Sequence, residues 1–463
     1  MTSPCSDAFV FFGATGDLAY KKIFPALQAM ILAGELEMPI IGIAYSGWSQ
    51  QQLRDRARAS IEEHATLDPA AFTRLCAQLY YLDGDYTQDA VYHELRQRLG
   101  QARRPLHYLA IPPSMFATVV QGLAKAGCAD NARIVVEKPF GRNLASAQAL
   151  NRTLQTVFPE SAIFRIDHYL GKEAVENLLY FRFANSFLEP LWNRSYIHSV
   201  EITLAESFGI EGRGSFYEEA GALRDVVQNH LLQVVTLLAM EAPVSTDPAG
   251  MRAEKLRLLR AMRPLEPGNV VRGQFDGYRH EKGVAPDSQV ETFIALRLHI
   301  DTWRWAGVPF YLRAGKCLPI TTTEVRVDLN PPPLPVFDVI SPAQSNFFRF
   351  RLSPEVVIAA GTRVKQAGSG MRGEGVELLA RNQPGYDALP YQRLLGDALR
   401  GDGTLFTSDA CVEQAWAVVQ PVLDAPGPVQ SYPRGSWGPP AAAAIVADTE
   451  GWHDPQPEAG APC

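Results

Sequence analysis

The chain has 463 residues, of which 46% are hydrophobic and 20% are charged, so it can bury more than one apolar core. Its formal net charge of -7 excludes a global positive field that would attract nucleic acid or an anionic membrane. The six cysteines show neither CxxC spacing nor a histidine at metal-ligand spacing, and we predict no metal site. The sequence shows neither a secretory signal pattern nor a run of 18 apolar residues, so we expect a cytoplasmic protein.

The first third of the chain alternates short apolar runs with amphipathic stretches. The apolar runs cover residues 9–12, 40–43, 106–111 and 134–136. Continuous apolar runs are typical of strands that are buried on both faces of a parallel sheet. We therefore predict an α/β, Rossmann-like dinucleotide-binding domain over residues 1–172.

A glycine-containing turn follows the first of these strands. Gly13-Ala14-Thr15-Gly16 lies between the strand and a helical pattern, where glycines let the backbone approach a pyrophosphate at a helix N-terminus. The spacing is GxxGxx and not GxGxxG, so this turn fits a dinucleotide site and equally a purely structural turn.

The end of the second strand normally reads the adenosine ribose, with an acid for NAD or an arginine for NADP. Here the strand is followed by Ala44-Tyr45-Ser46-Gly47, which contains neither. The hydroxyls of Thr15 and Ser46 could bond either cofactor, so the residues themselves leave the choice open.

Two further strand ends carry charged residues. Lys138 follows the strand at residues 134–136, at the edge where open α/β sheets bind ligands, although a solvated lysine in a turn is the simpler interpretation. Asp167, His168, Tyr169 and Lys172 follow another short strand, and the last three form a donor set suited to a phosphate.

From residue 173 onward the pattern indicates a larger α+β domain, which we place at residues 173–463. Residues 199–204, 289–298 and 347–352 alternate apolar and polar side chains, which predicts a mostly antiparallel sheet with one exposed face. The Pro- and Ala-rich segment after Pro439 is expected to lie loose.

One predicted helix in this second domain, residues 221–240, carries polar groups beside an apolar stripe. His230 lies on the stripe, and a satisfied core histidine is the simpler interpretation, but Arg224, Asp225, Gln228 and Asn229 share its two turns. Asp225 lies five positions before His230, roughly 140° around an α-helix, so another carboxylate must orient the imidazole. We expect Asp167 to do so.

At these residues the chain resembles the glucose-6-phosphate 1-dehydrogenase family along nearly its whole length. The shared motifs are GATGDLAYKKIFPAL at residues 13–27, EKPFG at 137–141, RIDHYLGKE at 165–173, RFAN at 182–185, EGRGSFYEEAGALRDVVQNHLLQ at 211–233, WRWAGVPFYLRAGK at 303–316 and GSWGP at 435–439.

The resemblance implies a role for each matching residue. His230 would be the general base that removes the C1 hydroxyl proton, and Asp167 would hold its imidazole. The implied binding residues are Gly13, Thr15, Gly16, Asp17, Leu18, Lys22, Ser46 and Lys138 for the cofactor, and Lys138, His168, Tyr169, Lys172, Glu206, Asp225 and Lys316 for glucose 6-phosphate.

The sequence departs from the family pattern at three places. Thr321 stands where relatives carry a substrate-facing cation, and Tyr45 stands where an NADP-selecting arginine is usual. The expected cofactor is therefore NADP, with NAD as an open possibility. Leu352-Ser353-Pro354 stands where many relatives carry Ile-Gln-Pro, and this difference has no physical explanation.

The sequence leaves two other functions open. One is a dehydrogenase of a different sugar, and the other is a non-catalytic paralogue that binds dinucleotide and acts through partners. The family further implies a homodimer or homotetramer that acts on a small-molecule substrate.

Overall fold

The computed structural model describes residues 5–167, 169–245, 247–334, 336–337, 345–381 and 389–458. Its contacts divide the chain into two compact units. The first unit comprises Met1–Lys172, Val244–Arg252 and Tyr386–Glu413, and the second comprises Glu173–Pro243, Ala253–Gly385 and Gln414–Cys463. Two later segments thus join the first unit beyond the boundary expected at residue 172.

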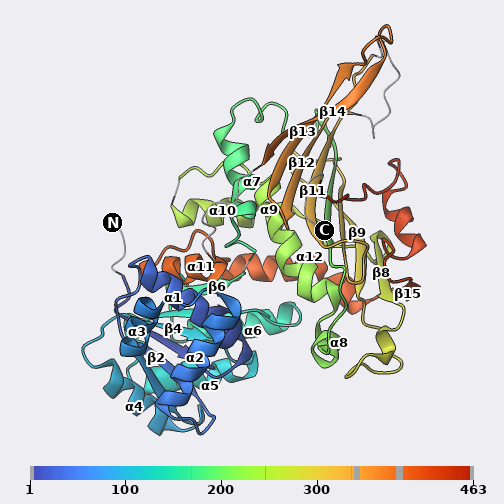
Figure 1. Cartoon of the computed structure of the whole chain (residues 1–463). Coiled ribbons are helices and arrows are strands. Elements are labelled where there is room, and N and C mark those ends of the chain that lie inside the picture. The colour runs from blue at the N-terminus through green and yellow to red at the C-terminus, as the bar shows by residue number, and fades with distance from the viewer. Residues whose placement is uncertain are drawn as a thin grey trace. The chain divides into compact units, whose positions relative to one another are not determined.

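The first unit is built on a parallel sheet, as predicted for a Rossmann-like domain (Figure 1). Its strands run in the order β3-β2-β1-β4-β5-β6, and every pairing is parallel. The central strands are buried on both faces, which explains their continuous apolar sequences. The strand bounds are β1 (Ala8–Phe12), β2 (Ile40–Ala44), β3 (Leu79–Asp83), β4 (Pro105–Leu109), β5 (Arg133–Glu137) and β6 (Ile163–Ile166).

Helices cover this sheet, and one of them comes from a distant part of the sequence. Leu394, Leu395 and Ala398 of α11 (Pro390–Arg400) join the apolar cluster that α1, α2 and α3 form against β1 and β2. The helix bounds are η1 (Ala19–Ile23), α1 (Phe24–Leu32), α2 (Gln50–His64), α3 (Pro69–Gln78), α4 (Asp89–Leu99), η2 (Pro113–Met115), α5 (Phe116–Lys125), α6 (Leu144–Gln155) and η3 (Glu160–Ala162).

The second unit holds a mixed, mostly antiparallel sheet in the order β14-β13-β12-β11-β7-β10-β9-β8-β15. The pairs β7–β10 and β8–β15 are parallel, and the other pairs are antiparallel. The strand bounds are β7 (Ile197–Ala205), β8 (Val270–Phe275), β9 (Phe293–Leu298), β10 (Phe310–Gly315), β11 (Thr322–Leu329), β12 (Phe347–Ser353), β13 (Val357–Lys365), β14 (Gly373–Arg381) and β15 (Val429–Tyr432).

The prediction of an exposed sheet face was wrong for β7, β10, β11 and β12, and the prediction of a loose segment after Pro439 was wrong for its described residues, 440–458. Residues 452–458 cover the polar face over these four strands, so Glu201 and Thr203 of β7 are buried. The backbone N–H of His453 donates to Glu201, and Asp454 pairs with Arg313 at 2.8 Å. We call residues 452–458 the C-terminal strap. The polar residues that alternate with apolar ones in these strands therefore face the C-terminal strap and not solvent.

The helix predicted over residues 221–240 is also divided differently. It consists of the end of α8 (Gly214–Ala222), the π-helix η4 (Leu223–Leu231) and α9 (Leu232–Ala239). A π-helix is rare and is often associated with functional sites. The remaining helices are α7 (Glu173–Ala184), α10 (Pro248–Ala261), η5 (Pro267–Asn269), η6 (Tyr278–His280), α12 (Asp409–Asp424) and η8 (Pro440–Val446). In the described part of the chain, no helix combines the length and the apolar composition needed to cross a membrane.

Candidate active site

The turn after β1 requires glycine at its first position. Gly13 has φ +83°, and a Cβ at this position would lie 2.2 Å from the Ala110 carbonyl oxygen, so only glycine fits. Its N–H donates to the Tyr86 hydroxyl at 2.9 Å, which fixes the turn from the end of β3. The half-buried Thr15 and the exposed Gly16 follow, with backbone accessible to a ligand. This part of the chain therefore fits the cofactor predicted for it.

Three further predicted cofactor residues lie just beyond this turn. Asp17 is exposed and lies 3.9 Å from Arg56, whereas Leu18 packs against the apolar core. Lys22 is exposed on η1. Asp17 and Lys22 are accessible to a ligand, and the Leu18 side chain supports the helix that follows the turn.

A polar corner lies beside the turn, where β2 ends. The hydroxyls of Thr15 and Ser46 are 2.8 Å apart and hydrogen-bonded to each other. Tyr45 is 74% exposed and supplies no charge. The Asp83 carboxylate, at the end of β3, accepts the backbone N–H of Ser46 at 3.0 Å. The corner thus holds an acid that the sequence did not reveal.

Lys138 follows β5, and the residue before it is a buried glutamate. The Tyr108 hydroxyl donates to the Glu137 carboxylate at 2.6 Å, and Tyr391 of α11 also bonds it. Burial raises the pKa of the Glu137 carboxyl to about 7, against the opposing effects of Tyr108, Tyr391 and Lys138. Lys138 therefore stands at the carboxyl end of the sheet beside a group that titrates near neutrality.

The residues after β6 form a compact turn. Asp167 is buried and its Oδ1 accepts the Tyr169 N–H at 3.0 Å. The Lys172 ammonium lies 3.7 Å from the centre of the Tyr169 ring, a cation–π contact. The structure thus brings together Asp167, Tyr169 and Lys172, whereas the predicted site residue His168 lies outside the described residues.

His230 lies on the π-helix η4 of the second unit and is only 3% exposed. In this helix type the hydrogen bonds link residues five apart, so Asp225 and His230 lie on the same side, one turn from each other. The angle of roughly 140° expected between them was wrong, because it assumed an α-helix. Asp225 is half-buried on the same helix.

The other predicted sugar-binding residues of the second unit form a charged cluster. The Lys316 ammonium lies 2.5 Å from Glu206 Oε2, at the ends of β10 and β7. It also lies 5.3 Å from the centre of the Tyr217 ring. Burial, and then the charges of Asp225 and Glu206, raise the pKa of the Tyr217 hydroxyl, which keeps it protonated as a donor. Glu206, Asp225 and Lys316 therefore share one polar region.

Thr321 is bound to the same region by its side chain. Its hydroxyl lies 2.8 Å from the Ser207 hydroxyl and accepts the Ser207 N–H at 3.0 Å. The position where the resemblance led us to expect a cation is thus occupied by a short neutral side chain hydrogen-bonded to the residue after Glu206.

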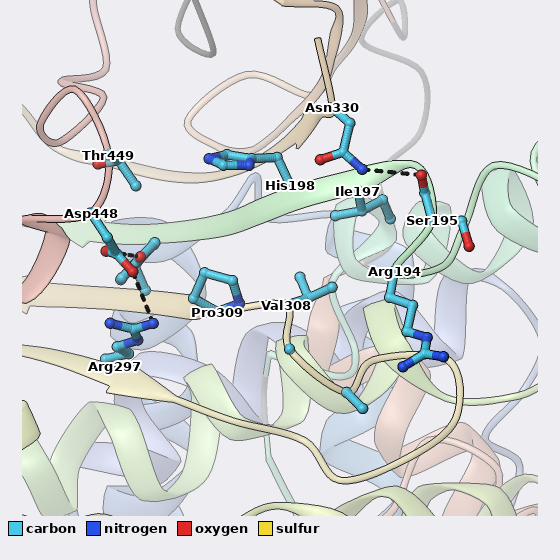
Figure 2. Close-up of a pocket in the computed structure, with 13 residues that line it drawn as sticks. Arg194, Ser195, Ile197, His198, Arg297, Val308, Pro309, Asn330, Asp448 and Thr449 are labelled. Carbon is cyan, nitrogen blue, oxygen red and sulfur yellow. Dashed lines mark hydrogen bonds and ion pairs between the residues drawn. The ribbon is translucent and has the colours of Figure 1, made fainter. Parts of the chain in front are cut away.

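A separate cavity of about 440 Å³ lies at the other end of β7 and β10 (Figure 2). Arg194, His198, Arg297 and Asp448 line it, and Arg297 pairs with Asp448 at 2.9 Å. None of the predicted site residues lines this cavity. The candidate site is therefore defined by chemistry and geometry at the strand ends and not by this cavity.

Several supporting groups were not predicted from the sequence, namely Asp83, Tyr86, Glu137, Tyr217, Ser207 and Tyr391. Asp83 and Tyr86 follow the run Leu79-Tyr80-Tyr81-Leu82, and this strand pattern with an Asp-Gly-Asp turn was the signal that could have found them. Within the described ranges, no three His, Cys, Asp or Glu side chains are grouped to hold a metal ion.

Each unit contributes a distinct kind of chemistry. The first offers a glycine turn at the end of a parallel strand, a lysine at another strand end and a Tyr–Lys pair suited to an anion. The second offers a buried imidazole with carboxylates and an ammonium, which suit a substrate with several hydroxyls.

Known families match both parts of the chain. The family model described as "Glucose-6-phosphate dehydrogenase, NAD binding domain" matches residues 10–177, and "Glucose-6-phosphate dehydrogenase, C-terminal domain" matches residues 179–453. The glucose-6-phosphate 1-dehydrogenase 1 of Mycobacterium tuberculosis is 45% identical over 454 residues, which cover 97% of each chain.

Solved structures give the same result. The crystal structure of glucose-6-phosphate 1-dehydrogenase from Mycobacterium avium superposes with a TM-score of 0.93 at 46% identity, covering 99% of this chain and all of that one. A glucose-6-phosphate dehydrogenase in complex with its substrate glucose-6-phosphate gives a TM-score of 0.90 at 34% identity, covering 98% of this chain and 100% of that chain.

Proposed function

The chain belongs to the glucose-6-phosphate dehydrogenase family, and we infer from this that it oxidises C1 of D-glucose 6-phosphate to 6-phospho-D-glucono-1,5-lactone. The observation that carries the inference is 45% identity along 97% of the chain to a glucose-6-phosphate 1-dehydrogenase. This reaction would be the first step of the pentose phosphate pathway.

We propose that His230 is the general base of this reaction. Its imidazole would remove the C1 hydroxyl proton, and a bound nicotinamide dinucleotide would supply the acceptor for the C1 hydride. As the family resemblance implies, Asp167 would hold the imidazole and stabilise its cationic form. The hydrogen bond from the Tyr169 N–H to Asp167 Oδ1 supports this role, because it fixes the orientation of the carboxylate.

The substrate would be held at both ends. His168, Tyr169 and Lys172 bind the 6-phosphate, since cationic and hydroxyl donors suit that dianion. Sugar hydroxyls are bound by Glu206, Asp225 and Lys316. Their close association with Tyr217 supports selection of a hexose, because a sugar lacking a hydroxyl would leave a buried polar group unpaired. Lys138 would contact substrate and cofactor.

The cofactor is a nicotinamide dinucleotide bound through Gly13, Thr15, Gly16, Asp17, Leu18, Lys22, Ser46 and Lys138. We propose that NADP is accepted and that NAD can replace it, since Tyr45 offers no charge to a 2′-phosphate. We further propose a homodimer or homotetramer in the cytoplasm.

The direct test is the absorbance of reduced nicotinamide on mixing the protein with glucose 6-phosphate and each dinucleotide in turn. We expect reduction with glucose 6-phosphate and little with glucose, because the phosphate contacts would be lost. Reduction with unphosphorylated sugars alone would indicate a different sugar dehydrogenase. Dinucleotide binding without reduction would favour the non-catalytic paralogue.

A further inference from the structure

The corner at the ends of β1, β2 and β3 is organised around one carboxylate. Asp83 Oδ1 accepts the backbone N–H of Ser46 at 3.0 Å and of Gly47 at 2.8 Å, and the Trp48 N–H also bonds the carboxylate. The Tyr81 hydroxyl donates to the same oxygen at 2.7 Å. Successive backbone N–H groups that converge in this way form an anion-binding nest. Here the anion is a side chain of the protein itself.

The charge in this nest is permanent at neutral pH. Burial raises the pKa of Asp83, but the hydrogen bonds from Ser46, Tyr81, Gly47 and Trp48 together lower it below its ordinary value. The loop at residues 44–49, Ala-Tyr-Ser-Gly-Trp-Ser, contains neither lysine nor arginine to balance this charge. The corner therefore presents an anion with neutral hydroxyls beside it.

NADP and NAD differ at the group that this corner would meet. In a Rossmann-like sheet the adenosine ribose is read at the end of the second strand, where NADP carries a 2′-phosphate and NAD a 2′-hydroxyl. A phosphate needs N–H donors or a cation, and it is repelled by a neighbouring carboxylate. A hydroxyl, in contrast, can bond to Ser46 or Thr15, whose hydroxyls are 2.8 Å apart.

We propose that Asp83 is a specificity-determining residue: it occupies the backbone donors that a 2′-phosphate would use, and it biases the cofactor corner toward NAD. This rests on the proposed function in one respect, because the dinucleotide must bind on the β1–β2–β3 edge. Asp83 acts by charge and by occupying the nest, without taking part in the chemistry.

Two variants separate these two effects. Asp83→Asn removes the charge but keeps an oxygen that accepts the N–H groups, whereas Asp83→Ala also vacates the nest. Asp85→Asn is the matched control, because its carboxylate bonds the N–H and hydroxyl of Thr87 and makes the same change in net charge two residues away.

The readouts are dissociation constants of AMP and adenosine 2′,5′-bisphosphate for the protein alone, and kcat/KM for NAD and NADP with glucose 6-phosphate. We expect the unaltered protein to favour the ligands without the 2′-phosphate. Asp83→Asn should shift the preference toward the 2′-phosphate ligands by about five- to tenfold, and Asp83→Ala further, while Asp85→Asn leaves it unchanged.

An equal change in ligand preference in Asp83→Asn and Asp85→Asn would overturn the proposal. It would show that the protein's net charge, and not the position of Asp83, sets the preference. A strong preference of the unaltered protein for NADP that neither Asp83 variant changes would also overturn it. Failure of the proposed function is distinguishable, because it would abolish turnover with both dinucleotides while the two adenosine ligands still report on the corner.

Discussion

The Lys316 ammonium lies 2.5 Å from the Glu206 carboxylate, and Thr321 binds Ser207, the next residue after Glu206. The ion pair fixes the relative orientation of two side chains that are predicted to bind the sugar. Thr321 lies beside the pair and contributes a hydroxyl where the family resemblance led us to expect a cation. This edge of the second unit therefore forms an internal hydrogen-bonded network with one positive charge fewer than we expected.

Restoring that charge should strengthen substrate binding. We expect Thr321→Lys to lower KM for glucose 6-phosphate by up to about tenfold, because a charge-assisted hydrogen bond contributes roughly 1.5 kcal/mol or more. Steady-state kinetics at fixed dinucleotide concentration measure the change. Thr321→Gln, which also breaks the Ser207 contact but adds no charge, is the control. An equal KM in both variants would contradict the expectation.

The Tyr86 hydroxyl accepts the Gly13 N–H at 2.9 Å and donates to the Ile43 carbonyl at 3.1 Å. Tyr86→Phe removes both bonds without changing the shape of the ring. We expect KM for the dinucleotide to rise roughly two- to tenfold with kcat nearly unchanged, because the turn loses one support. A fall in kcat with unchanged KM would show that the hydroxyl acts elsewhere.

Glu137 should make stability depend on pH. Its pKa is 4.5 in its ordinary state and about 7 when buried in the folded protein, so between these values the folded state binds more protons than the unfolded chain. The free energy of unfolding therefore falls as pH rises from about 4.5 to 7, by up to about 3 kcal/mol in total.

Glu137→Gln removes this titration. As pH rises from 5 to 8, the unfolding midpoint of the variant should rise relative to that of the unaltered protein. Thermal unfolding of both proteins in parallel buffers measures this difference. A difference in midpoint that stays constant over this range would show that Glu137 does not titrate there.

The C-terminal strap should stabilise the second unit. Glu458 lies 2.5 Å from Arg349, and both side chains are 8% exposed. Glu458→Gln leaves a buried guanidinium with one charge partner fewer, so we expect a loss of about 2–3 kcal/mol in the free energy of unfolding. Urea unfolding followed by tryptophan fluorescence measures it, with the exposed Glu374→Gln as control. Equal midpoints for the two variants would argue against a stabilising strap.

The parallel sheet and its glycine turn could be predicted because their signals are local. Residues 9–12 are apolar because β1 is buried on both faces, and Gly13 follows directly. The polar face of the second sheet was interpreted wrongly because the residues that cover it, such as His453 and Asp454, lie far away in sequence. Strand alternation shows that a face is polar, but it does not show whether water or another segment covers it.

The candidate site shows the same limit. Single residues such as His230 and Lys138 could be named from motifs, but their neighbours depend on long-range pairing. Asp83 meets Ser46 only because β3 lies beside β2, and the π-helical geometry that aligns Asp225 with His230 has no simple periodic signal.

The central claim is that the His230 imidazole removes the C1 hydroxyl proton, and a single-turnover measurement of hydride transfer in His230→Asn tests it most directly. Glucose 6-phosphate and dinucleotide affinities are measured on the same sample by equilibrium titration. If His230 is the base, the rate of nicotinamide reduction should fall by at least about a hundredfold while both affinities stay within a few-fold. Nicotinamide reduction at near the unaltered rate would contradict it.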